Sequence, residues 1–326
     1  MNEWRYWLAK NKGTLSATAI FVLMFAVYVG NHPAGFTANV VQTAANKATL
    51  LAFVAMAQSI VIMTAGIDLS VGMILVLTNC LASWLVVGTV AETSAGIMAV
   101  LGVGTLCGAL NGLIVIFGRL QPIVTTIATG AMFYGFALFL RPFPGGSVNE
   151  TLADLLTGKA FKVFPVSFIV LFVTVLLIWV PYSKSVLGRA SYAAGSSESA
   201  AYMSGMPVKR AKFAAYVLSG LLASLGGLYL TFFTYTGEAA YASGNTYTLF
   251  SIAAVVLGGV SLAGGRGSAV GAIFGALAFR TIGDLLFVFD FDPLWQPLFQ
   301  GLVLLLAVSV GAFGLFQVRN KLEWFR

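Results

Sequence analysis

The sequence predicts an all-α fold, a polytopic bundle of about ten transmembrane helices. Hydrophobic residues make up 59% of its 326 residues and charged residues only 9%, whereas soluble domains carry about 25% charged residues. Between Lys12 and Arg119 the chain has only three charged residues, Lys47, Asp68 and Glu92. Such long apolar runs are typical of helices that cross a bilayer, and they exclude a soluble domain there.

Ten segments are apolar enough to span a membrane as helices of about 20 residues. They cover residues 14–30, 48–66, 69–90, 95–117, 121–140, 163–181, 211–235, 249–264, 269–288 and 294–317. The first of them follows a positive start that also suits a signal peptide, but the lack of a clear cleavage site favours a retained helix. Because no linker or soluble domain interrupts the pattern, we expect one membrane domain over residues 1–326.

The distribution of lysine and arginine predicts the orientation. With the N-terminus inside, four basic residues lie outside (Lys47, Arg141, Lys159 and Lys162), Arg280 lies within a span, and the other thirteen of the 18 lie inside. Basic residues collect in cytoplasmic loops, so we expect both termini in the cytoplasm. The same asymmetry accounts for the net charge of +7, and no basic patch with interleaved aromatic residues indicates nucleic-acid binding.

Two patterns predict how the spans pack. The segments that begin at Gln121 and Gln296 both open with Gln-Pro, and they enter the membrane from opposite sides. An inverted repeat of spans 2–5 on spans 7–10 would produce this relation. Gly104, Gly108 and Gly112 recur every four residues, a spacing that indicates close contact between helices.

No motif indicates catalysis, a cofactor or a metal site. The sequence has no GxxxxGK[ST] loop, no HExxH and no Ser/His/Asp set, so an enzyme is not expected. His32 is the single histidine, which cannot build a metal site alone. Cys80 and Cys107 lie in apolar runs, and we interpret them as small packing residues.

Five polar residues within the spans, and Asp68 in the turn between spans 2 and 3, are candidates for a translocation path, because ionisable and amide groups are costly in lipid. Asp68, in TAGIDLSVG, either caps the next helix by accepting N–H bonds near Ser70 or lines the path. Arg280 and Asp284, four residues apart, either neutralise each other as a pair or line the path. Three amides either face a hydroxyl-rich solute or bond a neighbouring helix: Gln58, Asn79 and Asn111.

The polar segment AAGSSESAAYMSGMPVKRAK, residues 193–212, falls on the inner side. Ser196 or Ser197 would cap a short helix, Gly205 would end it, and Pro207 follows. One side of this helix carries small residues, namely Ala200, Ala201 and Ser204. The segment is therefore either a helix that seats in a partner protein or an ordinary solvated loop.

Five ordered motifs resemble those of the permease subunits of bacterial ATP-binding-cassette (ABC) sugar importers, the family of ribose, galactose, arabinose and xylose permeases. They are TAGIDLSVG (64–72), LNGLIV (110–115), GRASYAAGSSESAAYMSGMPVKRAKFAAYVLSG (188–220), SIAAVVLGGVSLAGGRGS (251–268) and GLVLLLAV (301–308). The resemblance implies a ten-span permease of the inner membrane for a monosaccharide or polyol. It also implies three kinds of partner: cytoplasmic ATPase subunits, a periplasmic binding protein and a second permease chain, identical or different.

In such permeases the loop over residues 188–212 holds the coupling helix that seats in the ATPase. Glu198, Ala200, Ala201 and Gly205 match the family pattern Glu-x-Ala-Ala-x3-Gly. The resemblance therefore favours docking over a solvated loop, and it explains why the chain has no nucleotide site of its own.

The sequence departs from the family at several positions near the outer mouth or within the spans. Thr248 and Phe250 stand where many sugar permeases have Glu and Asp, Tyr134 where Arg is common, and Gln300 where Lys is frequent. Span 9 has RTIGD where the family is usually rich in Asn. The cargo and the choice between a homodimer and a heterodimer therefore stay open.

Two rival functions stay open as well. A related permease could carry nucleosides or branched-chain amino acids. An ion-driven secondary transporter would need its own carboxylates, for which Asp68 and Asp284 are the candidates.

Overall fold

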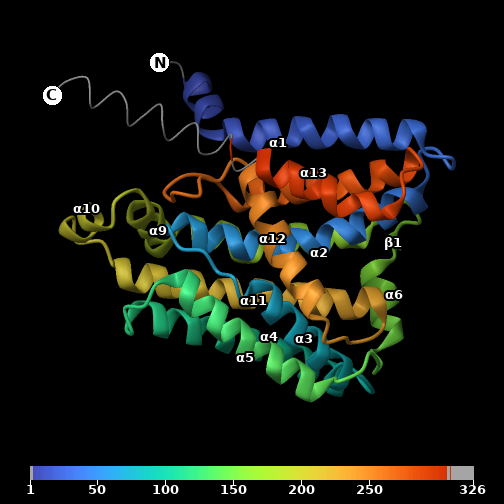
Figure 1. Cartoon of the computed structure of the whole chain (residues 1–326), viewed down its shortest axis with the longest axis horizontal. Coiled ribbons are helices and arrows are strands. Elements are labelled where there is room, and N and C mark those ends of the chain that lie inside the picture. Colours follow the sequence, from blue (N-terminus) through green and yellow to red (C-terminus); the bar gives the residue numbers. More distant parts are fainter. Residues whose placement is uncertain (1–2, 307–308, 310–326) are drawn as a thin grey trace.

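Most helices of the chain run along its longest dimension and form one bundle (Figure 1). The computed structural model describes residues 3–306 and 309 and is 78% helical. The longer helices are α1 (Glu3–Asn31), α2 (Ala38–Met63), α3 (Val71–Leu85), α4 (Val90–Ile116), α5 (Pro122–Leu140), α11 (Val208–Thr234), α12 (Tyr241–Leu257) and α13 (Ala269–Val288). The shorter elements are α6 (Glu150–Thr157), β1 (Lys159–Ala160), β2 (Phe164–Pro165), α7 (Val166–Thr174), η1 (Val175–Trp179), α8 (Val180–Lys184), α9 (Val186–Ser196), α10 (Glu198–Met203) and η2 (Pro293–Trp295).

Apolar helices fall on all ten predicted segments, but not all of them have the length of a span. Within the described residues, seven are long and apolar enough to cross a membrane: α1 from Asn11, α2, α4, α5, the α7–α8 segment, α11 and α13. Three are shorter, Val71–Leu85, Ala242–Leu257 and Pro293–Leu306. The predicted last span covers residues 294–317, and its part beyond residue 306, apart from residue 309, lies outside the described residues. The chain is thus an all-α, multi-pass membrane protein, and the count of ten spans stays a prediction.

Local side-chain chemistry moves several helix ends from their predicted positions. α2 starts well before residue 48, because the hydroxyl of Thr37 accepts a hydrogen bond from the N–H of Val40. α4 starts before residue 95, because Thr89 and Glu92 form a capping box. α12 ends before residue 264, because the loop that follows contains glycines with positive φ at positions 259, 264, 265 and 267.

The predicted span over residues 163–181 contains a π-helical turn. α7, η1 and α8 form one apolar segment, Val166–Lys184. Pro181 lies in the first turn of α8 and has no N–H to donate. The π turn η1 ends directly before α8, so the chain changes its hydrogen-bond register where the proline removes a donor.

α4 and α11 approach each other so closely that their backbones touch. A Cβ on Gly104 would lie 2.3 Å from the Cβ of Ser224, and one on Gly108 would lie 2.2 Å from the carbonyl oxygen of Tyr216. On the facing helix, a Cβ on Gly220 would lie 2.1 Å from the carbonyl oxygen of Gly104. The close packing predicted from the glycine spacing is confirmed.

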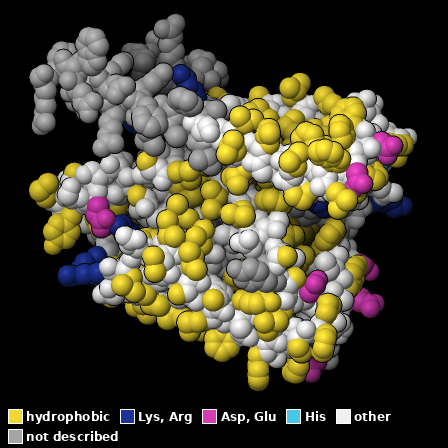
Figure 2. Space-filling view, viewed as in Figure 1, with side chains coloured by type: hydrophobic (Ala, Val, Ile, Leu, Met, Phe, Trp, Pro, Cys, Tyr) yellow, Lys and Arg dark blue, Asp and Glu magenta, His cyan; other side chains and the backbone are white. Residues whose placement is uncertain are grey.

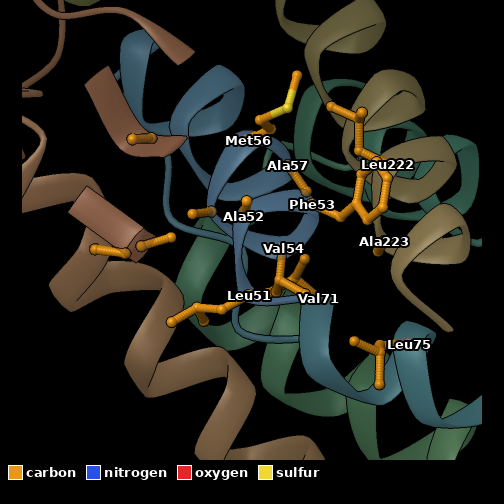
Figure 3. Close-up of a cluster of buried hydrophobic side chains, with 14 of the residues drawn as sticks. Leu51, Ala52, Phe53, Val54, Met56, Ala57, Val71, Leu75, Leu222 and Ala223 are labelled. Carbon is orange, nitrogen blue, oxygen red and sulfur yellow. The ribbon is translucent and has the colours of Figure 1, made fainter. Parts of the chain in front are cut away.

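α2 occupies the centre of the bundle. Over its span, 94% of its residues are buried inside the chain, and it packs against α11, α12 and α13. Leu51, Phe53 and Met56 of α2 belong to one cluster with Leu75 of α3 and Leu222 of α11 (Figure 3). Both cysteines are free and buried, as expected of packing residues. A shift of α2 would therefore be felt by most of the bundle.

The two ends of the bundle differ. One end carries α9, α10 and the start of α1, and the other carries α6 and the hairpin β1–β2 (Figure 1), in which Lys159 pairs with Pro165. On the face that Figure 2 shows, hydrophobic side chains cover the middle and most charged side chains lie toward the two ends. This distribution fits a belt of lipid around the middle of the bundle.

Candidate functional site

α10 is a short helix with a side-chain cap at its start and a glycine at its end. The hydroxyl of Ser197 accepts a hydrogen bond from a backbone N–H of the first turn, as predicted. At the other end, the N–H of Met206 donates to the carbonyl of Ala201, and the N–H of Gly205 donates to that of Tyr202. These two bonds form a Schellman motif, which requires a left-handed residue, and Gly205 supplies it with a φ of 73°.

Of the small residues predicted to form one side of α10, Ala200 and Ser204 are exposed but Ala201 is not. Ala201 is only 5% exposed, because it packs against Ala194 and Val208. Its side chain is therefore not available to a partner, and it holds α10 against α9 and α11. Tyr202 and Met203, which sequence reasoning missed, project instead and are 71% and 80% exposed. Their signal in the sequence is that they are two adjacent bulky residues in a segment of small and polar ones.

The other predicted contact residues are exposed, namely Glu198, Ala200 and Gly205. Glu198 forms an ion pair with Lys212 of α11, and the carboxylate side chain is still 61% exposed. Lys209 and Arg210 are exposed at the start of α11. This end of the bundle therefore offers two apolar side chains next to basic ones, a combination that suits a protein partner.

α9 connects α10 to the centre of the bundle. A Cβ on Gly195 would lie 2.0 Å from the carbonyl oxygen of Met63, the last residue of α2, and 2.4 Å from the backbone nitrogen of Gly265. The N–H of Gly265 donates to the same carbonyl over 3.0 Å. The hydroxyl of Tyr192 donates to the carbonyl of Gly267 over 2.8 Å. Burial raises the pKa of Tyr192 to about 12, so this hydroxyl keeps its proton at neutral pH.

Asp68 lies at a buried junction of four helices. Its carboxylate accepts hydrogen bonds from the N–H and the hydroxyl of Ser70, at 3.0 and 2.6 Å, and from the hydroxyl of Ser219 in α11, at 3.1 Å. Asn111 of α4 donates to the Ser70 hydroxyl over 2.7 Å and accepts from Thr129 of α5 over 2.6 Å. The predicted bond to the Ser70 N–H is confirmed, and Asn111 bonds neighbouring helices.

The two other candidate amides differ in their bonding. Asn79 donates to the hydroxyl of Thr231 over 2.9 Å and accepts from the N–H of Glu238 over 2.9 Å, so it joins α3 to α11. Gln58 of α2 is fully buried, and neither its Oε1 nor its Nε2 has a hydrogen-bond partner within the described residues. An unpaired buried polar group costs about 1–3 kcal/mol. The amide of Gln58 can therefore still form hydrogen bonds, whereas the amide of Asn79 already forms its bonds within the protein.

Arg280 and Asp284 do not form an ion pair with each other, so one of the two predictions for them is wrong. Among the described residues Asp284 pairs with Lys47 of α2, whose Nζ lies 3.3 Å from Oδ1. Lys47 is 237 residues away in the sequence, so the spacing along α13 could not reveal it. Arg280 and Asp284 instead line one pocket, between the ends of α1 and α13 and the start of α2. The six candidate path residues thus do not form a single site.

Comparison with known proteins identifies the family. The profile of a family described as "Branched-chain amino acid transport system / permease component" matches residues 40–308. The chain belongs to this permease family. Over 258 residues it is 36% identical to the ribose import permease protein RbsC of Bacillus subtilis, with 78% of this chain and 79% of the relative covered. No solved structure shows a significant match.

Two further members of the permease family match over more of the chain. The ribose import permease protein RbsC of Escherichia coli K12 is 34% identical over 311 residues, which cover 93% of this chain and 94% of the relative. The fructose import permease protein FrcC of Rhizobium meliloti is 32% identical over 310 residues, 91% of this chain and 83% of the relative. The expected relationship to sugar-importer permeases is confirmed. Subunits of this kind are transporters rather than enzymes, and they work with an ATPase and a substrate-binding protein.

Proposed function

We propose that this chain is the membrane-spanning subunit of an ATP-driven importer that moves a monosaccharide or a related polyol into the cytoplasm. The observation that carries the proposal is the match to ribose and fructose import permeases over 93% and 91% of the chain. Most of the polar side chains buried in the bundle are neutral amides and hydroxyls. Such groups can exchange hydrogen bonds with the hydroxyls of a neutral sugar.

The proposed topology has ten spans in the bacterial inner membrane, with both termini in the cytoplasm. α10 and the start of α1 lie at the same end of the bundle (Figure 1). Exposed Lys209 and Arg210 lie at that end, where the positive-inside rule places basic residues. Residues 1–326 then form one membrane domain, and residues 188–212 form its largest internal cytoplasmic loop.

We propose α10 as the helix that binds the ATPase. Tyr202 and Met203 would supply the apolar anchor, because aromatic residues and Met are enriched in the cores of protein interfaces. Three exposed residues of the predicted motif would surround that anchor, namely Glu198, Ala200 and Gly205. Ala201 contributes from beneath by fixing α10 on α9 and α11. The backbone contact of Gly195 with Met63 would then pass movement of α10 to the central helix α2.

The proposed inverted repeat of spans 2–5 on spans 7–10 indicates where the path runs. α3 and α12 are short apolar helices in corresponding positions of the two halves, and segments of this kind point to transporter binding sites. Their starts touch. The N–H of Gly72 donates to the Thr248 hydroxyl over 3.1 Å, and a Cβ on Gly72 would lie 1.9 Å from the carbonyl oxygen of Gly244. Separation of α3 from α12 would open this contact to a solute.

The transport cycle follows as alternating access. Closure of the ATPase pair would shift α9 and α10, and the bundle would open toward one side and then the other. Gln58 would use its free amide for the cargo once the interior opens, while Asp68, Asn79 and Asn111 hold the surrounding helices together. A second permease chain, identical or different, and a periplasmic binding protein at the end that carries α6 would complete the assembly.

Uptake of a labelled sugar by cells tests this function. A strain that lacks the gene should lose high-affinity uptake of one monosaccharide, and the wild-type chain should restore it. An excess of the unlabelled sugar should compete, whereas adenosine and leucine should not. Loss of leucine or nucleoside uptake in the deletion strain, with sugar uptake unchanged, would contradict the proposed cargo class.

A further inference from the structure

A charged pocket lies at the end of the bundle opposite α10, outside the proposed path between α3 and α12. It has a volume of about 420 Å³ and is lined by the end of α1, the start of α2, the end of α13 and residues 291–296 around the start of the last apolar helix. Pockets of about 300–1,000 Å³ are typical of sites for small molecules. Tyr28 of α1 and His32, just after that helix, line it, and Lys47, Arg280 and Asp284 contribute the charges.

The charges of this pocket do not balance. Lys47 pairs with Asp284 over 3.3 Å, and the side chain of Asp284 is only 9% exposed. Arg280 lines the same pocket one helical turn before Asp284 and forms no ion pair within the described residues. The two cations, Lys47 and Arg280, and the one carboxylate, Asp284, leave a net positive charge. A partly buried guanidinium beside lipid is costly unless an anion pairs with it.

The rim of the pocket carries exposed aromatic side chains. Phe287 and Phe291, which line it, are 69% and 46% exposed, and Trp295, four residues after Phe291, is 52% exposed. Aromatic side chains of this kind collect at the level of the lipid headgroups. α1, which forms one wall, has only 11% of its span buried inside the chain. The pocket is therefore open to molecules that have apolar tails.

We propose that this pocket binds a membrane phospholipid, with its phosphate held by Arg280 and Lys47. A guanidinium can hold two phosphate oxygens at once, and Asp284 positions the Lys47 ammonium beside it. Acyl chains would lie against Phe287 and Phe291. The site does not depend on which cargo the chain transports, because it lies apart from the proposed path.

The test compares ligands that share only part of a phospholipid. The full-length chain is stripped of lipid in mild detergent, and its melting temperature is measured against added phosphatidylglycerol, diacylglycerol or inorganic phosphate. Phosphatidylglycerol should raise the melting temperature, whereas diacylglycerol and phosphate should have little effect. In Arg280→Gln the half-saturating concentration of phosphatidylglycerol should rise about tenfold, as expected for the loss of a charge-assisted contact. Arg280→Lys keeps the charge and should have an intermediate effect.

Lys162→Gln is the matched control, because Lys162 is exposed, lies outside this pocket and should bind phosphatidylglycerol as the wild type does. Three results would overturn the proposal. They are an equal lipid response in Arg280→Gln and wild type, a full response to diacylglycerol, or a response to inorganic phosphate as strong as that to the lipid. If Arg280→Gln elutes as aggregate in gel filtration, the same comparison is made between Arg280→Lys and wild type.

Discussion

The contact between α9 and α2 predicts that Gly195→Ala will separate ATPase binding from transport. Gly195 lies two residues before the cap of α10, so the exposed surface of α10 keeps its own hydrogen bonds and packing. The new methyl group, however, would lie 2.0 Å from the carbonyl oxygen of Met63 and 2.4 Å from the nitrogen of Gly265. Both are backbone atoms, which cannot turn away as a side chain can.

The size of the effect follows from these distances. Ordinary van der Waals contact begins at about 3.4 Å, so α9 and the end of α2 must separate by about 1.4 Å, the difference between 3.4 and 2.0 Å. Overpacking of this kind typically costs about 1–3 kcal/mol, and a site bounded by backbone lies at the upper end. The same displacement breaks the packing through which movement of α10 would reach α2.

The assay measures uptake of the labelled sugar together with co-purification of the ATPase. Gly195→Ala should co-purify with near wild-type amounts of ATPase but lose at least about tenfold in uptake, which is the equivalent of about 1.4 kcal/mol. Gly102→Ala is the control, because a Cβ on Gly102 meets nothing within 4 Å. Wild-type uptake by Gly195→Ala would refute the proposed connection. Equal loss of uptake and of ATPase binding would show that α9 and α10 act only as a docking surface.

Three further predictions test other parts of the structure. Exchange of Tyr202 and Met203 for Ser should reduce co-purification of the ATPase, with a loss of about 2 kcal/mol or more if they anchor the interface. Asp284→Asn should lower stability by about 1–3 kcal/mol, and the loss should be smaller in the double variant with Lys47→Gln, because the pair is removed together. Asp68→Ala should lower the melting temperature more than Asp68→Asn, because Ala orphans the buried hydroxyls and N–H that Asp68 accepts from.

Each of these predictions has its own control. Phe161 is 96% exposed at the opposite end of the bundle, so Phe161→Ser should leave ATPase binding unchanged. For the second prediction, the control is the double variant Arg280→Gln with Asp284→Asn. Its loss of stability should equal the sum of the two single losses, and a smaller loss would indicate that Arg280 and Asp284 pair with each other after all. Asp68→Asn should still transport. Loss of uptake with an unchanged melting temperature would instead point to a direct role of the Asp68 charge.

The sequence predicted those features of the candidate site that depend on neighbouring residues. The cap at Ser197 and the stop at Gly205 are local hydrogen-bond choices, so they can be recognised from a few positions. Which side of α10 is exposed depends on how α9 and α11 pack under it. That is why the inward position of Ala201 and the exposure of Tyr202 were not foreseen.

Other features could not be predicted from the sequence, because they depend on contacts between residues that are far apart in the chain. The spacing of Arg280 and Asp284 allowed a pair on one helix as one of two interpretations, but Lys47 of α2 binds the carboxylate instead. The predicted span over residues 69–90 was longer than α3, because the apolar pattern does not mark where the helix ends. The segment after Leu85 is as hydrophobic as the helix itself, although the helix ends at Leu85 and a new capping box opens at Thr89.

The measurement that tests ATP-driven import most directly is uptake by proteoliposomes built from purified components. With the binding protein outside and the ATPase and ATP inside, the chain should accumulate the labelled sugar, and ionophores should not prevent it. Without ATP or without the ATPase, uptake should cease. Sugar accumulation by the chain alone, driven by an ion gradient and abolished by an ionophore, would contradict the proposed function.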